Sequence, residues 1–207
     1  MEAVLQSARS TAVRRGRRLE YLTITWNGLE GLLAVGLGLL AGSVALVGFG
    51  MDSAIEVTSG AALLWRLGQD DTPARERAEH VTLKVVGWCF LLLAVYVAHD
   101  SLSSLAGRHA PDRSILGIVL AIASLIVMPV LARAKRKVAR EIGSAALHAD
   151  AKQTEFCMYL SVILVAGLAL NGLLAWWWAD PAAGLLMAPI IAREGFLTLR
   201  GRPCCTC

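Results

Sequence analysis

The chain has 207 residues, of which 56% are hydrophobic and 17% are charged, and its mean hydropathy is +0.58. Soluble domains carry about 25% charged residues, so this composition excludes an ordinary soluble protein and indicates a membrane protein. The net charge is +4, but the basic runs directly flank apolar segments, which argues against a nucleic-acid-binding protein.

Six apolar segments follow one another along the chain, and most have the roughly 20 residues needed to cross a bilayer. A basic tail at residues 1–19 precedes this six-helix domain (residues 20–199), and residues 200–207 form a cysteine-rich tail. The sixth segment is the weakest, because Arg193 and Glu194 interrupt it. We predict an all-α membrane protein with six transmembrane helices, at residues 20–40, 44–67, 84–106, 114–132, 147–171 and 181–199.

The basic residues predict the orientation of these spans. Most of the 20 Lys and Arg residues lie in the N-terminal tail, in the connections after the second and fourth spans, and at the C-terminal end. Because positive charge is retained in cytoplasmic loops, both termini are predicted to be cytoplasmic, in a multi-pass protein of the plasma or inner membrane. The connection after the fourth span holds Arg133, Lys135, Arg136, Lys137 and Arg140.

The second span contains two acidic residues, Asp52 and Glu56, which are four positions apart and therefore share one helical face. Each charge near the bilayer centre costs about 2.5–3.5 kcal/mol on insertion scales. The pair is therefore expected to bind a cation or protons. The alternative is a structural role in pairing helices, with Lys152 as a possible partner.

The fifth span carries a polar face made of Asp150, Gln153, Thr154 and Cys157, at helical spacing. If the second and fifth spans face each other, Asp52, Glu56, Gln153 and Cys157 surround one point, and Asp150 lies about one turn closer to the cytoplasm. Carboxylate, amide and thiolate ligands suit a borderline divalent transition metal, and thiolate argues against magnesium or calcium. Two other roles stay open: Cys157 as a small apolar residue and Gln153 as an interhelical hydrogen bonder.

These motifs resemble those of the cation diffusion facilitator family, over nearly the whole chain. The family's second-span motif is Asp-x-x-x-Asp, and here it reads Asp52-Ser-Ala-Ile-Glu56. Its fifth-span motif is often Ala-Asp-x-x-His-x-x-x-Asp, and here Gln153 stands for the histidine and Cys157 for the last aspartate. The family's cytoplasmic C-terminal domain is absent, so the resemblance implies a membrane-only branch.

The resemblance implies a homodimeric antiporter that exports a divalent metal, most often zinc, in exchange for protons by alternating access. The metal is then a substrate, with no permanently bound cofactor, and the protein is not an enzyme. A membrane-embedded enzyme is disfavoured because the chain lacks a second Asp-rich repeat, a phosphate-binding glycine loop and an HExxH motif. A non-transporting metal sensor or partner subunit stays open.

Residues predicted on the cytoplasmic side, at the start of the fifth span and in the C-terminal tail, could collect metal for the site. The C-terminal tail contains three thiols within four residues, and on the reducing side of a membrane these do not form a structural disulfide. A dispensable tail is an equal alternative, because one short segment cannot supply four well-placed ligands. The candidate capture residues are His148, Cys204, Cys205 and Cys207.

Overall fold

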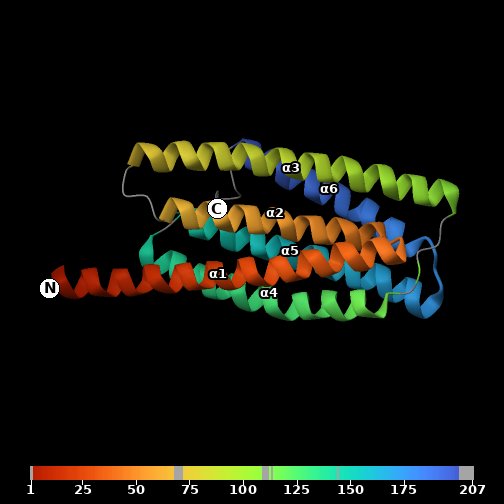
Figure 1. Cartoon of the computed structure of the whole chain (residues 1–207), viewed down its shortest axis with the longest axis horizontal. Helices are drawn as coiled ribbons and strands as arrows, with labels where there is room; N and C mark the ends of the chain where they lie inside the picture. The colour runs from red at the N-terminus through yellow and green to blue at the C-terminus, as the bar shows by residue number, and fades with distance from the viewer. Residues whose placement is uncertain (1, 68–71, 109–111, 113, 144, 201–207) are drawn as a thin grey trace.

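The computed structural model describes residues 2–67, 72–108, 112, 114–143 and 145–200. All regular structure in these ranges is helical, which confirms the predicted all-α fold (Figure 1). The helices are α1 (Glu2–Ala41), α2 (Val44–Leu67), α3 (Thr72–Gly107), α4 (Ile115–Ile142), α5 (Ala145–Leu174) and α6 (Ala179–Leu199).

Five of the helices are long and apolar enough to cross a membrane, by length and composition. They include α6, although the sequence made it the weakest span. The second helix, α2, does not meet this criterion over its described residues, because it carries Asp52 and Glu56. It nevertheless lies among the other helices and runs along the same axis (Figure 1). The five segments are Thr11–Ala41, Leu83–Gly107, Ile115–Ile142, Asp150–Leu174 and Ala179–Leu199.

Several helices extend beyond the predicted spans. Helix α1 begins at Glu2, inside the predicted tail, and α4 continues to Ile142 instead of ending at 132. Hydropathy marks the part of a helix that lipid surrounds, but backbone hydrogen bonding continues past it until a stop signal. That signal is Gly143 for α4, where a left-handed conformation (φ 65°) caps the helix. The basic run after position 132 is therefore helical.

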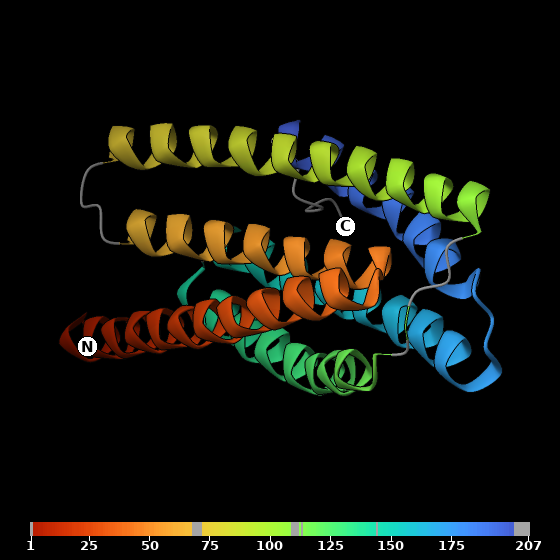
Figure 2. The same ribbon diagram turned by 45° about the vertical axis from the view of Figure 1, so that its right-hand side comes forward.

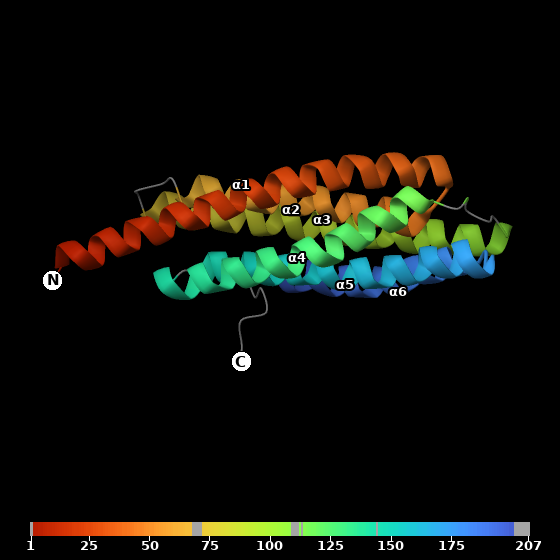
Figure 3. The same ribbon diagram turned by 90° about the horizontal axis from the view of Figure 1, so that it is seen from below.

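Four helices form a bundle, and the other two lie beside it. Helix α1 packs extensively on α2 and α4 on α5, while contacts of α1 with α4 and of α2 with α5 complete the bundle. Helices α3 and α6 pack on each other and contact the bundle through α2 and α5 (Figure 2). Viewed from below, α1 and α4 lie next to each other on the near side of the molecule, with α2 and α5 behind them (Figure 3). Helices α2 and α5 thus meet inside the molecule.

The bundle has polar side chains inside and apolar side chains outside. Leu32, Leu40 and Leu173 are 78%, 83% and 82% exposed, whereas Asp52 and Glu56 are buried. Outward leucines are compatible with lipid, because hydrocarbon tails are as apolar as leucine. The arrangement fits a membrane protein whose chemistry lies between its helices.

The turn between α1 and α2 brings these two helices close together. Gly42 adopts a left-handed conformation (φ 65°), which glycine accepts without strain. At Gly38 a β-carbon would lie 2.7 Å from the Val47 side chain and 2.8 Å from the Val47 backbone nitrogen. The two glycines therefore have different roles: Gly42 makes the turn, and Gly38 allows close packing.

Helix α6 is tied to this turn by a buried hydrogen bond. The Ser43 hydroxyl donates to a carboxylate oxygen of Asp180, and both residues are buried. The same hydroxyl oxygen accepts from the backbone N–H of Leu46 at 3.2 Å. Ser43 therefore caps the start of α2 and joins it to α6.

Candidate ion-binding site

The two acidic residues of α2 lie in the interior of the bundle. Asp52 is 3% exposed and Glu56 is 1% exposed. They sit one turn apart on a helix that contacts α1, α3, α5 and α6. A pair of buried carboxylates inside a membrane helix marks a functional site by default.

Helix α5 places a thiol beside the first of these carboxylates. Cys157 is fully buried, and its side chain interacts with the carboxylate of Asp52. The prediction that the second and fifth spans face each other is therefore correct at this point. Sulfur beside a carboxylate gives the position a mixed soft and hard character.

A third carboxylate approaches from α1. Glu30 is 1% exposed and accepts a hydrogen bond from the Ser53 hydroxyl at 3.0 Å. It lies within electrostatic range of Asp52 and Cys157. Glu30 thus connects α1 to α2 through Ser53.

Glu56 is hydrogen-bonded to Thr154, the residue that follows Gln153 at the motif's histidine position. The Thr154 hydroxyl donates to Glu56 Oε1 at 2.6 Å. Gln153 is half-buried, and its amide nitrogen is buried without a hydrogen-bond partner among the described residues. The predicted polar face of α5 therefore meets α2 through Thr154 and Cys157.

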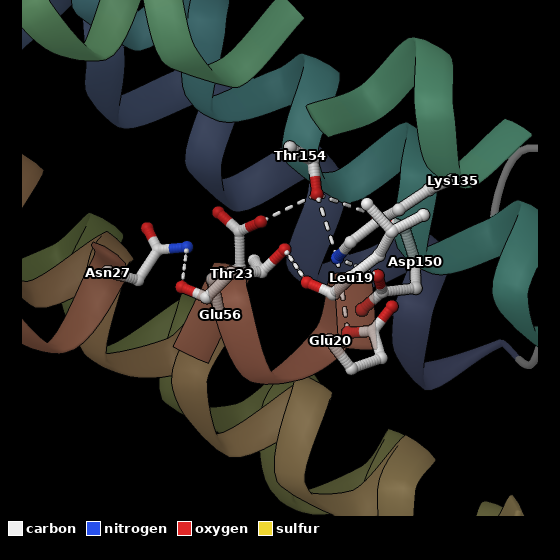
Figure 4. Close-up of polar contacts among 8 residues, drawn as sticks. All are labelled: Leu19, Glu20, Thr23, Asn27, Glu56, Lys135, Asp150 and Thr154. Atoms are coloured by element: carbon white, nitrogen blue, oxygen red, sulfur yellow. Dashed lines mark hydrogen bonds and ion pairs between the residues drawn. The ribbon is translucent and has the colours of Figure 1, made fainter. Parts of the chain in front are cut away.

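Asp150 contacts a buried lysine instead of the acidic pair. Its carboxylate forms an ion pair with Lys135 of α4, and Lys135 Nζ also lies 3.2 Å from Glu20 Oε2 of α1. Nζ is 3.4 Å from Thr154 Oγ1, so Thr154 stands between Lys135 and Glu56 (Figure 4). The acidic pair and the lysine therefore belong to one continuous polar network.

Lys135 and Glu20 were missed as site residues, although the sequence contains the signal for both. We predicted Lys135 in a cytoplasmic connection, whereas α4 continues through it and its side chain is fully buried. It continues the buried stripe of α4 at positions 128, 132, 135 and 139, spaced by four, three and four. On α1 a spacing of three, four and three joins Glu20, Thr23, Asn27 and Glu30, all of them buried.

Carboxylate oxygens in this interior are left without partners. One oxygen of each of four acids is buried and makes no hydrogen bond to the described residues. Buried polar atoms without partners are costly, so such a group is expected to bind something. The atoms are Glu20 Oε1, Glu30 Oε1, Glu56 Oε2 and Asp150 Oδ1.

Among the described residues, no three His, Cys, Asp or Glu side chains are close enough together to hold a metal ion. Asp52, Glu56 and Cys157 share the interior, but they do not form a closed coordination shell. Binding of a metal by these three groups therefore requires side chains or helices to move.

The remaining predicted residues are the candidates for metal capture. His148 is half-buried near the start of α5, while Cys204, Cys205 and Cys207 fall outside the described residues. Glu155, also on α5, forms a partly exposed ion pair with Arg136.

Comparison with known proteins identifies similar chains. A family model described as the cation efflux transmembrane domain matches residues 22–201. An uncharacterized transporter from Synechocystis sp. is 26% identical over 160 residues, which cover 74% of this chain and 52% of that protein. Transmembrane protein 163 from Xenopus laevis is 24% identical over 183 residues, 87% of this chain and 65% of that protein. The aligned regions thus span about half to two thirds of the length of these relatives.

Proposed function

The chain belongs to the cation efflux family, and from that premise we propose that it exports a divalent transition metal, preferentially zinc, in exchange for protons. The family assignment supports metal-cation transport across a membrane. The observation that carries the specific site is the placement of Cys157 beside Asp52, with Glu56 one turn away, inside the bundle. The proposal includes a homodimer in the plasma or inner membrane, as the family resemblance implies.

In the proposed mechanism the metal enters from the cytoplasm and binds Asp52, Glu56 and Cys157. Gln153 takes the fourth position, because its buried amide nitrogen makes no hydrogen bond to the described residues and Asp150 is engaged by Lys135. Zinc accepts four such mixed oxygen and sulfur ligands. The bundle then closes at the cytoplasmic end and opens at the other, which is alternating access.

Charge balance explains why protons would drive the exchange. Two carboxylates in the bilayer interior are costly unless their charge is neutralised. A divalent ion would offset this charge when Asp52, Glu56 and the Cys157 thiolate bind it, and a proton returned to each of these three groups would offset it when the ion leaves, so each form of the site can cross between the two open states. Because metal ligands must be deprotonated, protons arriving from outside compete with the metal and release it.

The test is zinc flux into proteoliposomes under an imposed pH gradient, comparing the wild type with Asp52→Asn. Glu141→Gln is the matched control, because Glu141 is a partly exposed carboxylate that pairs with Arg15 away from the site. We expect flux to require the gradient, to be lost in Asp52→Asn and to persist in Glu141→Gln. Zinc binding without flux would replace the proposal with the sensor function, and flux unaffected by Asp52→Asn would refute the site.

A further inference from the structure

The proposed transport site does not use Lys135, although this is a charged side chain buried completely inside the bundle. Its ammonium group has three N–H donors, and three oxygen atoms lie around it. They belong to Glu20 Oε2 at 3.2 Å, to Asp150 Oδ2, and to Thr154 Oγ1 at 3.4 Å. These three contacts of the Lys135 ammonium are all to oxygen atoms, so the ammonium occupies a position that resembles a cation-binding site (Figure 4).

Two carboxyl groups contact the single ammonium group of Lys135. Glu20 is fully buried and Asp150 is 5% exposed, and both contact Nζ. Each also has a second carboxylate oxygen, Glu20 Oε1 and Asp150 Oδ1, that is buried without a partner among the described residues. Two free oxygens beside an occupied cation position indicate capacity for a more highly charged ion.

The position lies between the transport site and one end of the bundle. Asp150 precedes Cys157 on α5 by about two turns, or about 10 Å at the helical rise of 1.5 Å per residue. Through Thr154, Lys135 is connected to Glu56. The contacts join α1, α4, α5 and α2, so these helices cannot separate at this level while Lys135 keeps its partners.

We propose that Lys135 is a tethered cation that fills a second divalent-cation site between Glu20 and Asp150, and that a substrate ion displaces it on the way to Asp52. The direction in which the ion moves, from this second site to Asp52, rests on the proposed function. The existence of the second site does not depend on transport. Its ligands are carboxylate and hydroxyl oxygens, so without Lys135 it favours a hard divalent ion such as Mn²⁺.

The first test counts bound Mn²⁺ by electron paramagnetic resonance in purified protein. All variants carry Asp52→Asn, so that binding at the transport site does not obscure the count. Lys135→Met, which keeps a long apolar stem, should bind an additional Mn²⁺ ion per chain. Lys135→Arg, which keeps the charge, should not, and adding Glu20→Gln to Lys135→Met should abolish the extra ion.

The second test measures transport kinetics in variants that retain Asp52. Lys135→Met should lower KM for the metal by about tenfold, equivalent to about 1.4 kcal/mol, and should also lower kcat, because the ion is retained at the second site. Lys135→Arg should restore both values. A lysine that only stabilises the fold would reduce the amount of folded protein without lowering KM.

A third measurement uses the wild-type chain, in case Lys135→Met does not fold. A small membrane-permeable amine-acetylating reagent, followed by peptide mass spectrometry, should modify Lys135 only when saturating Zn²⁺ or Mn²⁺ is present. Lys84, which is exposed on α3, should react under both conditions. Lys135 labelling that does not change with metal, or an extra Mn²⁺ ion that survives Glu20→Gln, would overturn the proposal. Either result leaves the Asp52→Asn flux experiment as a separate test of the transport site.

Discussion

Thr154 shows how a single hydroxyl can organise two charged groups. It donates to Glu56 Oε1 and lies 3.4 Å from Lys135 Nζ, so the carboxylate and the ammonium each contact the same oxygen. A hydroxyl can donate one hydrogen and accept others, which is what this position requires. No aliphatic side chain of similar shape could do both.

Replacing Thr154 with valine should therefore destabilise the bundle. Thr154→Val keeps the shape but removes the donor to Glu56, and a buried acceptor without its donor costs about 1–3 kcal/mol. Thr154→Ser keeps the hydroxyl and is the matched control. Unfolding in mixed detergent micelles would measure the difference, and equal stability of the two variants would contradict the role given to this hydroxyl.

Cys157 should determine which metals the protein prefers. Thiolate favours soft and borderline ions, whereas carboxylate favours hard ones. Cys157→Asp should lower the ratio of Cd²⁺ to Mn²⁺ flux by about tenfold, a change of about 1.4 kcal/mol in relative affinity. Cys89→Ala, at an exposed cysteine, is the control. An unchanged ratio would mean that Cys157 is a packing residue and not a ligand.

At the scale of residues, the sequence predicted the acids and the thiol but not the lysine network. Asp52, Glu56 and Cys157 stand out because polar groups are rare inside apolar runs. Lys135 does not stand out, because it lies in a basic run that hydropathy assigns to the cytoplasm. Only its position in the buried stripe of α4 distinguishes it from Arg133 and Lys137, and stripes near helix ends are easily overlooked.

At the scale of elements, close packing of α1 on α2 depends on a residue without a side chain. Gly38→Ala would place a β-carbon 2.7 Å from the Val47 side chain and 2.8 Å from the Val47 backbone nitrogen. Since a backbone atom cannot move aside easily, the helices must separate. Gly36 has no other atom within 4 Å of such a β-carbon, so it offers a matched position on the same helix.

We expect Gly38→Ala to lower the thermal stability of the detergent-solubilised protein. Gly36→Ala should leave it unchanged or raise it slightly, because alanine favours a helix over glycine by about 0.5–1 kcal/mol. Size-exclusion chromatography after a series of heating steps would measure both. If the two variants lose folded protein at the same temperature, close packing at Gly38 does not contribute to stability.

The helices themselves were predictable, but not all of their ends. Apolar runs located each of the six, whereas the end of α4 at its Gly143 cap lies beyond the predicted end at 132. The start of α1 at Glu2 and the continuation of α4 past 132 were not predicted. Hydropathy falls where a helix leaves lipid, whereas the helix ends only where its backbone hydrogen bonding does.

At the scale of the whole molecule, the helices alternate in direction, so α6 runs back toward the end at which α1 starts (Figure 1). The distribution of basic residues predicts that this end is cytoplasmic. A green fluorescent protein fused to the C-terminus should therefore fluoresce in a bacterial host, and an alkaline phosphatase fused there should be inactive. The opposite pair of results would reverse the direction assigned to transport.

The division into a bundle and a separate pair of helices could not be read from the sequence. Every span is apolar on its outer side, so hydropathy carries no information about which helices touch. The pairing of α3 with α6 depends on side-chain packing between segments far apart in the chain. The contact of α2 with α5 was predictable only because both carry polar residues at compatible depths.

The hydrogen bond between Ser43 and Asp180 has a mechanical consequence. It fastens the beginning of α6 to the beginning of α2, at the end of the molecule opposite the lysine network. A buried contact that joins the α3–α6 pair to the bundle at one end can act as a hinge point between the two parts. Small rotations of the α3–α6 pair about this hinge point would produce their largest displacements at the far ends of the helices, where the ion would enter.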